Sequence, residues 1–187
     1  MQPPNEITDN TILLRQYHLS DIPMIVEAVR ESADELKPWI SWCQHEYTEE
    51  QARIWLESLT ESWDKGISYD FAIIDSTDGS YLGGCGINHI RWTYRFANLG
   101  YWVRTERTRQ GIASRVVPLL ARFDFEHLGL VRVEVVVAVG NKVSRRVAQK
   151  VGAAREGILR NRIVIGENVY DAVMHSLIPQ DFDEEAR

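Results

Sequence analysis

The residues best suited to chemistry lie between positions 100 and 153. An apolar run that includes Trp102 and Val103 leads into the polar turn Arg109-Gln110-Gly111-Ile112-Ala113-Ser114, which opens a helical pattern. A helix start leaves backbone N–H groups unpaired at the positive end of the helix dipole, and these groups favour anions. Gly111 carries no Cβ, so a phosphate could approach the backbone closely there. The turn is a candidate phosphate site, although an ordinary strand-to-helix turn has a similar composition.

A second polar pair, Asn141 and Ser144, stands three residues apart where another helical pattern begins. Asn141 is a good N-cap residue, and Ser144 would then be an ordinary residue of the first turn. A hydroxyl in that turn also lies in a positive field, which suits stabilisation of a departing thiolate. Composition alone favours capping, and the two roles are compatible.

The general base is the least defined group in the sequence. Asp70, His89, Glu46 and Asp21 are all conceivable, and each is more often structural than functional. We take Asp70 as the candidate base and His89 as a candidate substrate contact. At pH 7.5 an α-amine is roughly one-third neutral, whereas a lysine is only about 0.1% neutral, a gap of about 3 kcal/mol. If the chain transfers a group to an amine, the lack of an obvious base therefore favours an α-amine over lysine as the acceptor.

Six tryptophans are many for this length. Trp55 and Trp63 lie on the apolar face of a helical pattern, so we expect them in the core. Trp39 and Trp42 follow Pro38 in an irregular segment, where an aromatic wall could hold a substrate. Core packing is about as good an explanation for this second pair.

Composition limits the function classes. The chain has 187 residues and a formal net charge of −6, which indicates one domain over 1–187 and disfavours a nucleic-acid partner. Cys43 and Cys85 lack metal-ligand spacing, so we expect neither a metal site nor a disulfide framework. No signal peptide or membrane span is evident, and a cytoplasmic location is the expectation.

Periodicity predicts a mixed α/β sheet covered by helices. A helix should start at Ser20-Asp21 and run to Pro38, and another should start at a capping box, Thr48 to Gln51. The predicted strands are 11–16, 69–75, 81–90, 98–104, 130–139, 160–165 and 169–178. Two further helices are predicted, one after Gly111 and one over 141–151.

The turn resembles the acetyl-CoA-binding motif of the GNAT N-acetyltransferase superfamily, Arg/Gln-x-x-Gly-x-Gly/Ala. The match is Thr108-x-x-Gly111-x-Ala113, in which Thr108 departs from the pattern and flanking arginines could supply the charge. Other segments resemble the RimJ/RimL group, which acetylates the N-termini of ribosomal proteins. These segments are Glu31-Ser32, Leu36-x-Pro38-Trp39-Ile40-x-Trp42, Asn141-x-x-Ser144, Glu156-Gly157-x-Leu159-Arg160 and Asp171.

The resemblance implies a GNAT fold, a mixed and mostly antiparallel sheet whose central strands splay, with acetyl-CoA as co-substrate. The pantetheine arm would lie between strands 98–104 and 130–139, and a backbone N–H of Trp102 or Val103 would bond the thioester oxygen. Ser144 would be the acid for the thiolate, and Asn141 would bind pantetheine or hold the turn. The segment with Trp39 and Trp42 would line the acceptor site.

Three functions remain open from the sequence. The first is acetylation of an α-amine, such as a protein or peptide N-terminus. The second is acetylation of a small amine (an aminoacyl antibiotic, a toxin or a polyamine) in detoxification, because one fold hosts many functions. The third is a non-catalytic acyl-CoA-binding regulator, which the presence of Ser144 disfavours. Assembly into a homodimer is left open.

Overall fold

The structure is a computed structural model that describes residues 3–183. Its strands are β1 (Glu6–Thr8), β2 (Ile12–Gln16), β3 (Tyr69–Asp75), β4 (Tyr81–Arg91), β5 (Phe96–Val103), β6 (Arg132–Ala138), β7 (Ala154–Ile165) and β8 (Asn168–Leu177). Its helices are α1 (Ile22–Glu31), α2 (Ala33–Leu36), α3 (Glu49–Asp64), α4 (Ile112–His127) and α5 (Lys142–Lys150), with short 3-10 turns η1 (Leu19–Asp21), η2 (Thr105–Arg107) and η3 (Pro179–Phe182).

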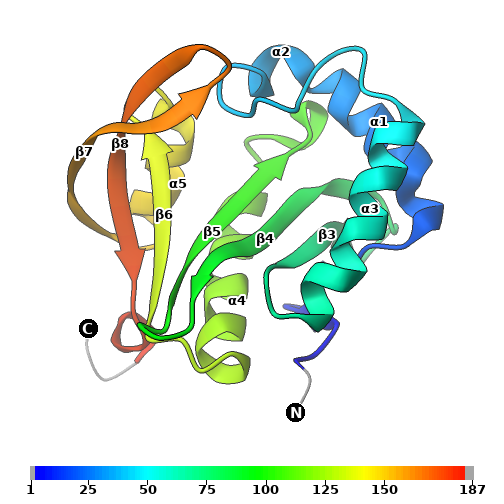
Figure 1. Cartoon of the computed structure of the whole chain (residues 1–187). Helices are drawn as coiled ribbons and strands as arrows, with labels where there is room; N and C mark the ends of the chain where they lie inside the picture. Colours follow the sequence, from blue (N-terminus) through cyan, green and yellow to red (C-terminus); the bar gives the residue numbers. More distant parts are fainter. Residues whose placement is uncertain (1–2, 184–187) are drawn as a thin grey trace.

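The described strands form one sheet of eight, in the order β1-β2-β3-β4-β5-β6-β8-β7. All neighbouring pairs are antiparallel except β5 and β6. These two parallel strands pair over only three residues, from Phe96 opposite Arg132 to Asn98 opposite Glu134. Beyond that point β5 and β6 diverge (Figure 1). The mixed, mostly antiparallel sheet with splayed central strands is thereby confirmed.

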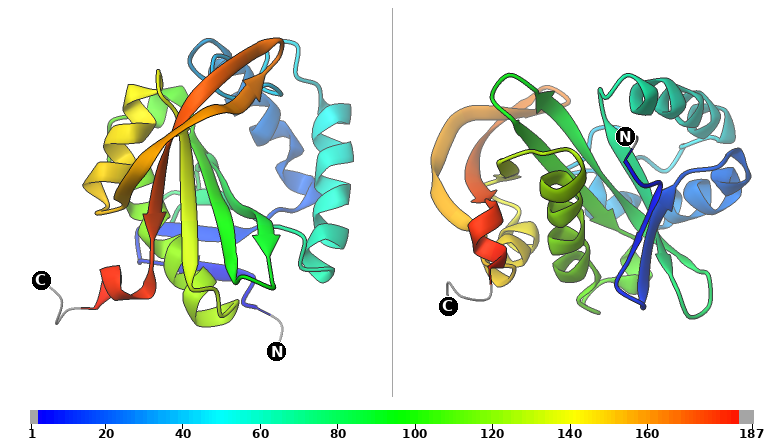
Figure 2. Two further views of the ribbon diagram at one scale, coloured as in Figure 1. Left: turned by 60° about the vertical axis from the view of Figure 1, so that its left-hand side comes forward. Right: turned by 90° about the horizontal axis from the view of Figure 1, so that it is seen from below.

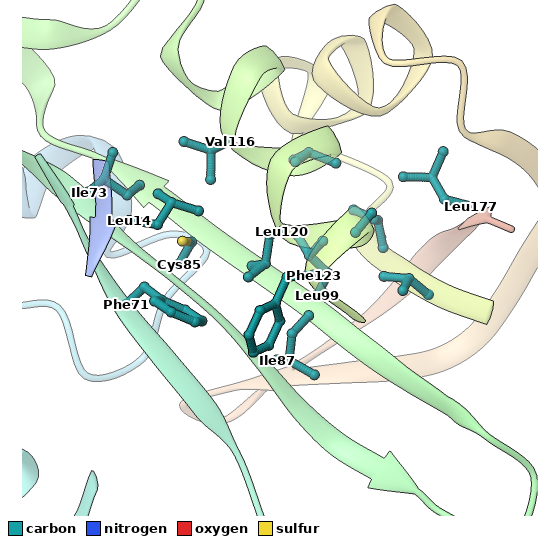
Figure 3. Packing of buried hydrophobic residues seen from close by; sticks show 14 of the residues in the cluster. Leu14, Phe71, Ile73, Cys85, Ile87, Leu99, Val116, Leu120, Phe123 and Leu177 are labelled. Carbon is teal, nitrogen blue, oxygen red and sulfur yellow. The ribbon is translucent and has the colours of Figure 1, made fainter. Parts of the chain in front are cut away.

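Helices cover both faces of the sheet. Figure 2 shows α1 and α3 on one side and α4 and α5 on the other. The core on the α4 side is built by Val116, Leu120 and Phe123 of α4 against strand residues that include Phe71 and Leu99 (Figure 3). A separate apolar cluster joins α1 and α3 to the opposite face. Burial on both faces explains why the central strands read as apolar runs.

Local signals in the sequence set several boundaries. Thr48 caps α3: its hydroxyl accepts from the N–H of Gln51 at 3.2 Å, and the Gln51 side chain accepts from the N–H of Thr48 at 2.8 Å. This reciprocal pair is the predicted capping box. Strand β3 has the predicted limits, Tyr69 to Asp75. The capping box acts within four residues, so the sequence shows it directly.

Three predicted boundaries are wrong. Strand β1 was not predicted, because three exposed or half-exposed residues leave no periodic pattern. Strand β7 starts at Ala154 rather than near 160, since two register shifts against β8 obscure its alternation. The first predicted helix breaks at Ser32 into α1 and α2, because Ser32 leaves helical geometry and accepts a backbone hydrogen bond from Thr105.

The sequence-based expectations about cysteines, membrane spans and metal sites can be compared with the structure of residues 3–183. Cys43 and Cys85 are both buried and free. No described helix has the length and apolar character to cross a bilayer. Within the same residues, no group of three His, Cys, Asp or Glu side chains comes together as a metal site.

Candidate active site

The divergence of β5 and β6 opens a cavity of about 700 Å³, which we call the splay cavity. Its walls are residues 99–103 of β5 and 135–138 of β6, and its mouth is the turn before α4. Of the sequence-predicted binding residues, the lining includes Trp102, Val103, Arg109, Gly111, Ile112, Ala113, Ser114 and Asn141. Gln110 is not part of this lining, because its side chain turns back toward the carbonyl of Glu106.

The turn at the mouth has the geometry of an anion cradle. Arg109 and Gly111 both have positive φ, +62° and +79°. Gly111 is the N-cap of α4 and has no side chain that could cap the helix, so the first-turn N–H groups stay available to a ligand. A Cβ at Gly111 would meet nothing within 4 Å, so the space beside this backbone is open. Successive N–H groups around such a turn bind phosphate oxygens.

A network of carboxylates holds the segment before this turn. Arg104 forms ion pairs with Glu31 and with Glu27 of α1. Glu31 also accepts the backbone N–H of Glu106 at 2.9 Å, and buried Ser32 accepts that of Thr105 at 3.0 Å. The pair Glu31-Ser32 therefore fixes η2, which leads into the anion cradle. Sequence reasoning noted this pair only as part of a resemblance, because its partners lie more than 70 residues away.

Strand geometry distinguishes the two predicted amide donors. Arg104 donates its N–H to Leu82 on β4 at 2.9 Å. N–H groups point to the same side at alternate residues of a strand, so that of Trp102 also faces β4, opposite Gly84. Those of Tyr101 and Val103 face the splay cavity. Of the two predicted backbone donors, the N–H of Val103 points into the splay cavity and that of Trp102 does not. The N–H of Tyr101 also points into the cavity, which the sequence analysis did not predict.

Ser144 lies in the lining of the splay cavity, in the first turn of α5. Asn141 caps α5 by accepting the N–H of Ser144 at 3.0 Å. The hydroxyls of Ser144 and Tyr101 lie 2.9 Å apart, and burial raises the pKa of the Tyr101 phenol. Tyr101 therefore stays protonated and can donate to the Ser144 oxygen, which leaves the Ser144 proton free for a group in the cavity.

A second cavity of about 640 Å³ lies between the sheet and helices α1 and α3. We call it the aromatic groove, because its lining includes five aromatic side chains that face the α1–α3 side: Tyr17, Trp42, Tyr47, Trp55 and Trp102. Asp70 lies in it, partly buried and accepting from the Ser68 hydroxyl at 2.8 Å. Desolvation by burial raises the pKa of Asp70.

Two glycines lead from Asp70 to the splay. Asp70 pairs with Gly86 on β4, and Gly86 pairs with Gly100 on β5. A Cβ at Gly86 would lie 2.5 Å from Asp70 Oδ1, so the carboxylate lies over this glycine. A Cβ at Gly100 would meet nothing within 4 Å, and Gly100 lines both cavities. With strands about 4.8 Å apart, the carboxylate is about 5 Å from Gly100, where the cavities meet.

Other sequence-predicted residues are distributed differently. Trp39 lines the splay cavity and its ring lies against Gly140, so it is separated from Trp42 in the aromatic groove. His89 is exposed and lines neither cavity. Trp55 packs against the apolar cluster of α1 and α3, as expected, and also lines the aromatic groove. Trp63 packs on Tyr69 and Phe71, also as expected.

Two of the other base candidates have different surroundings. Asp21 is engaged by the guanidinium of Arg15, at 2.7 and 2.9 Å, and by the N–H of His18. Glu46 is exposed and lines neither cavity. Of the four base candidates from the sequence, only Asp70 lines a cavity among the described residues.

The sequence matches the model of a known enzyme family. Residues 11–154, 144 of the 187, match the family model described as "Acetyltransferase (GNAT) domain". The chain belongs to the GNAT acetyltransferase family. It is an acetyl-CoA-dependent N-acetyltransferase, and within the family it resembles the RimJ/RimL-type group.

Individual proteins are similar to this chain in sequence or in fold. A Bacillus subtilis protein named "Putative ribosomal N-acetyltransferase YdaF" is 26% identical over 177 residues, 93% of this chain and 94% of its own. The structure of Mycobacterium smegmatis RimJ with a CoA-disulfide has a TM-score of 0.89 at 22% identity, over 98% of this chain and 93% of its own. The ribosomal-protein-S5-alanine acetyltransferase of Vibrio fischeri has a TM-score of 0.83 at 22% identity, over 95% and 98%.

The residues of this GNAT protein fit acetyl-CoA. The cradle at Gly111 suits its pyrophosphate, and the unpaired edges of β5 and β6 suit the amides of its pantetheine arm. Arg107, Arg109, Arg146 and Lys150 line the same cavity and supply positive charge for the phosphates. Arg145 instead donates to the carbonyl of Val139 at 3.0 Å. Bound acetyl-CoA supplies a thioester whose carbonyl carbon accepts the amine and whose sulfur leaves.

Substitution Gly111→Glu tests the cradle. Glu adds a side chain where φ is +79° and a negative charge beside the phosphates, so we expect acetyl-CoA affinity to fall by more than tenfold. Titration calorimetry with acetyl-CoA measures the change. An unaltered affinity in a variant with the circular dichroism of the parent protein would contradict the assignment.

Proposed function

We propose that this N-acetyltransferase acetylates the α-amine of a peptide or protein N-terminus, with Asp70 as general base. The observation that carries the proposal is the row Asp70–Gly86–Gly100. It leads from the aromatic groove, through two positions without side chains, to the point where β5 leaves β6. An amine held over Gly100 would lie between the Asp70 carboxylate and the thioester.

The proton of the amine leaves through Asp70 in this proposal. As the nitrogen–carbon bond forms, the ionised carboxylate accepts a proton from the attacking nitrogen. Desolvation by burial raises the pKa of Asp70, which makes its carboxylate a stronger base than that of an exposed aspartate. The glycines at 86 and 100 are required because a side chain at either position would separate base and amine.

The leaving thiolate and the carbonyl oxygen use groups on β5 and α5. The N–H groups of Tyr101 and Val103 point toward the splay cavity and can stabilise negative charge on the thioester oxygen. As the carbon–sulfur bond breaks, Ser144 gives its proton to sulfur. Tyr101, whose hydroxyl is 2.9 Å from Ser144 Oγ, keeps its proton and orients the Ser144 hydroxyl, and solvent then returns a proton to Ser144 and takes the proton held by Asp70.

An N-terminal peptide fits the shape of the aromatic groove. A volume of about 640 Å³ exceeds what a single small amine fills, and it lies within the usual range for a ligand of several groups. YdaF is named a putative ribosomal N-acetyltransferase, and the Vibrio fischeri protein is named a ribosomal-protein-S5-alanine acetyltransferase, which supports a protein acceptor. No metal takes part in the steps proposed here.

The test compares three classes of acceptor with acetyl-CoA, following CoA release. They are peptides with a free Ser or Ala terminus, the same peptides N-blocked with an internal lysine, and small amines such as polyamines. Because an α-amine is about 250-fold more often neutral than lysine at pH 7.5, we expect at least a 100-fold preference for the first class. The value of kcat/KM for the peptide should rise with pH and level off near pH 8.

Three results would contradict this function. A preference for blocked lysine peptides, with a rate still rising beyond pH 10, excludes the α-amine. A strong preference for a small amine moves the enzyme to detoxification. CoA binding without turnover of any class would support a non-catalytic regulator.

A further inference from the structure

We propose that the aromatic groove selects peptides whose second residue is aromatic or bulky apolar, and that it rejects an acidic second residue. This inference rests on the proposed function, since it assumes that the α-amine lies over Gly100. It goes further by naming the groove side chains that recognise the residue after the amine-bearing one.

The groove floor limits where the amine can reach the sheet. A Cβ at Gly84 would collide with the Tyr17 hydroxyl and lie 2.8 Å from Trp102 Nε1, so those side chains already fill the space above Gly84. Asp70 fills the space above Gly86 in the same way. Only Gly100, of these three glycines, has open space above it. The amine therefore reaches the sheet at Gly100, and the following residue of the peptide lies farther out in the groove.

The outer walls suit an aromatic second residue. Trp42 meets Trp102 edge to face, with ring centroids 6.1 Å apart, and lies at the same distance from Tyr47. Across the groove, Tyr17 and Trp55 form another edge-to-face pair at 4.9 Å. These pairs fix the walls before a substrate arrives. Trp42 remains 45% exposed, so its indole still has surface to cover with a ligand.

The charge of the groove excludes acidic side chains. Among the described residues that line it, Asp70 is the only charged one, and no Lys or Arg is present. A substrate carboxylate would lose hydration among apolar rings, find no cation, and lie near the Asp70 carboxylate. A neutral aromatic side chain has no charged group to dehydrate, and it removes apolar surface from water when it binds.

The first experiment uses the unaltered enzyme and three C-terminally amidated peptides, Ser-Phe-Ala-Ala, Ser-Ala-Ala-Ala and Ser-Asp-Ala-Ala. We expect kcat/KM for the Phe peptide to exceed that for the Asp peptide by at least 30-fold, mostly through KM. Values within threefold across the Ser peptides would overturn the inference while leaving the proposed function standing.

The second experiment assigns the preference to the wall. In Trp42→Ala, the ratio of kcat/KM for the Phe peptide over the Ala peptide should fall to threefold or less. The matched control is Trp92→Ala, because Trp92 is similarly exposed (48%) and lines neither cavity. That control should keep the parent ratio. If Trp42→Ala keeps it too, the second residue is recognised elsewhere and the inference is wrong; if no peptide reacts but small amines do, the proposed function itself fails.

Discussion

Substitution Asp70→Asn lowers kcat for a Ser-initiated peptide about 100-fold at pH 7.5, with little change in acetyl-CoA affinity. Asn keeps the size of the side chain and can still accept from the Ser68 hydroxyl, so the groove keeps its shape. It cannot accept a proton, and removal of a general base typically costs about 100-fold or more. Steady-state kinetics with CoA release measure the effect. A kcat within threefold of the parent value would show that the amine loses its proton directly to water.

Stability provides an independent readout for the same variant. Burial raises the pKa of Asp70 in the folded state, so folding is favoured below the pKa of the unfolded chain and loses part of this stability as pH rises through the folded pKa. Asn is neutral at every pH, so the Asp70→Asn variant does not lose this stability. Its Tm at pH 7.5 should therefore be equal to or higher than that of the parent protein. A purely structural Asp70 would instead lower Tm on substitution.

Asp124→Asn is the matched control. Asp124 on α4 is fully buried, its carboxyl pKa is also raised by burial, and it lines neither cavity. This variant should therefore keep the parent kcat. A comparable fall in kcat in both variants would mean that loss of a buried carboxylate anywhere disturbs the enzyme, and Asp70 would lose its assigned role.

Substitution Ser144→Ala should lower kcat by roughly 100-fold while acetyl-CoA affinity changes less than threefold. The reason is the position of its hydroxyl in the splay cavity, at the positive end of α5. Asn141 accepts the backbone N–H of residue 144, which Ala retains, so the cap of α5 survives. Turnover at the parent level would leave Ser144 with a structural role only.

The Tyr101→Phe variant separates positioning from packing. It removes the hydroxyl that lies 2.9 Å from Ser144 Oγ and keeps the ring between the two cavities. We expect kcat to fall about tenfold without a change in KM for either substrate, because the Ser144 proton is no longer directed into the cavity. In the double variant Tyr101→Phe, Ser144→Ala, the loss of kcat should be close to that of Ser144→Ala alone, since the two hydroxyls act as a unit.

Local sequence determined the parts of the site that close within a few residues. The cradle around Gly111 needs one glycine and one helix start, the cap of α5 needs Asn141 three residues before Ser144, and the capping box of α3 spans four residues. Hydrogen bonds over such short separations depend little on the rest of the chain. The alternation of apolar residues likewise indicated most strands and the mixed sheet.

Only the tertiary structure decided which distant side chains share a cavity. Tyr101 and Ser144 meet across 43 residues, and the row Asp70–Gly86–Gly100 depends on the register of three strands. A slip of one residue would turn Asp70 to the opposite face of the sheet. Trp39 and Trp42 are three residues apart in sequence yet line different cavities, because the segment after α2 is irregular. Residue spacing alone carries no information about register or loop path, so the groove and its base could be defined only in the folded chain.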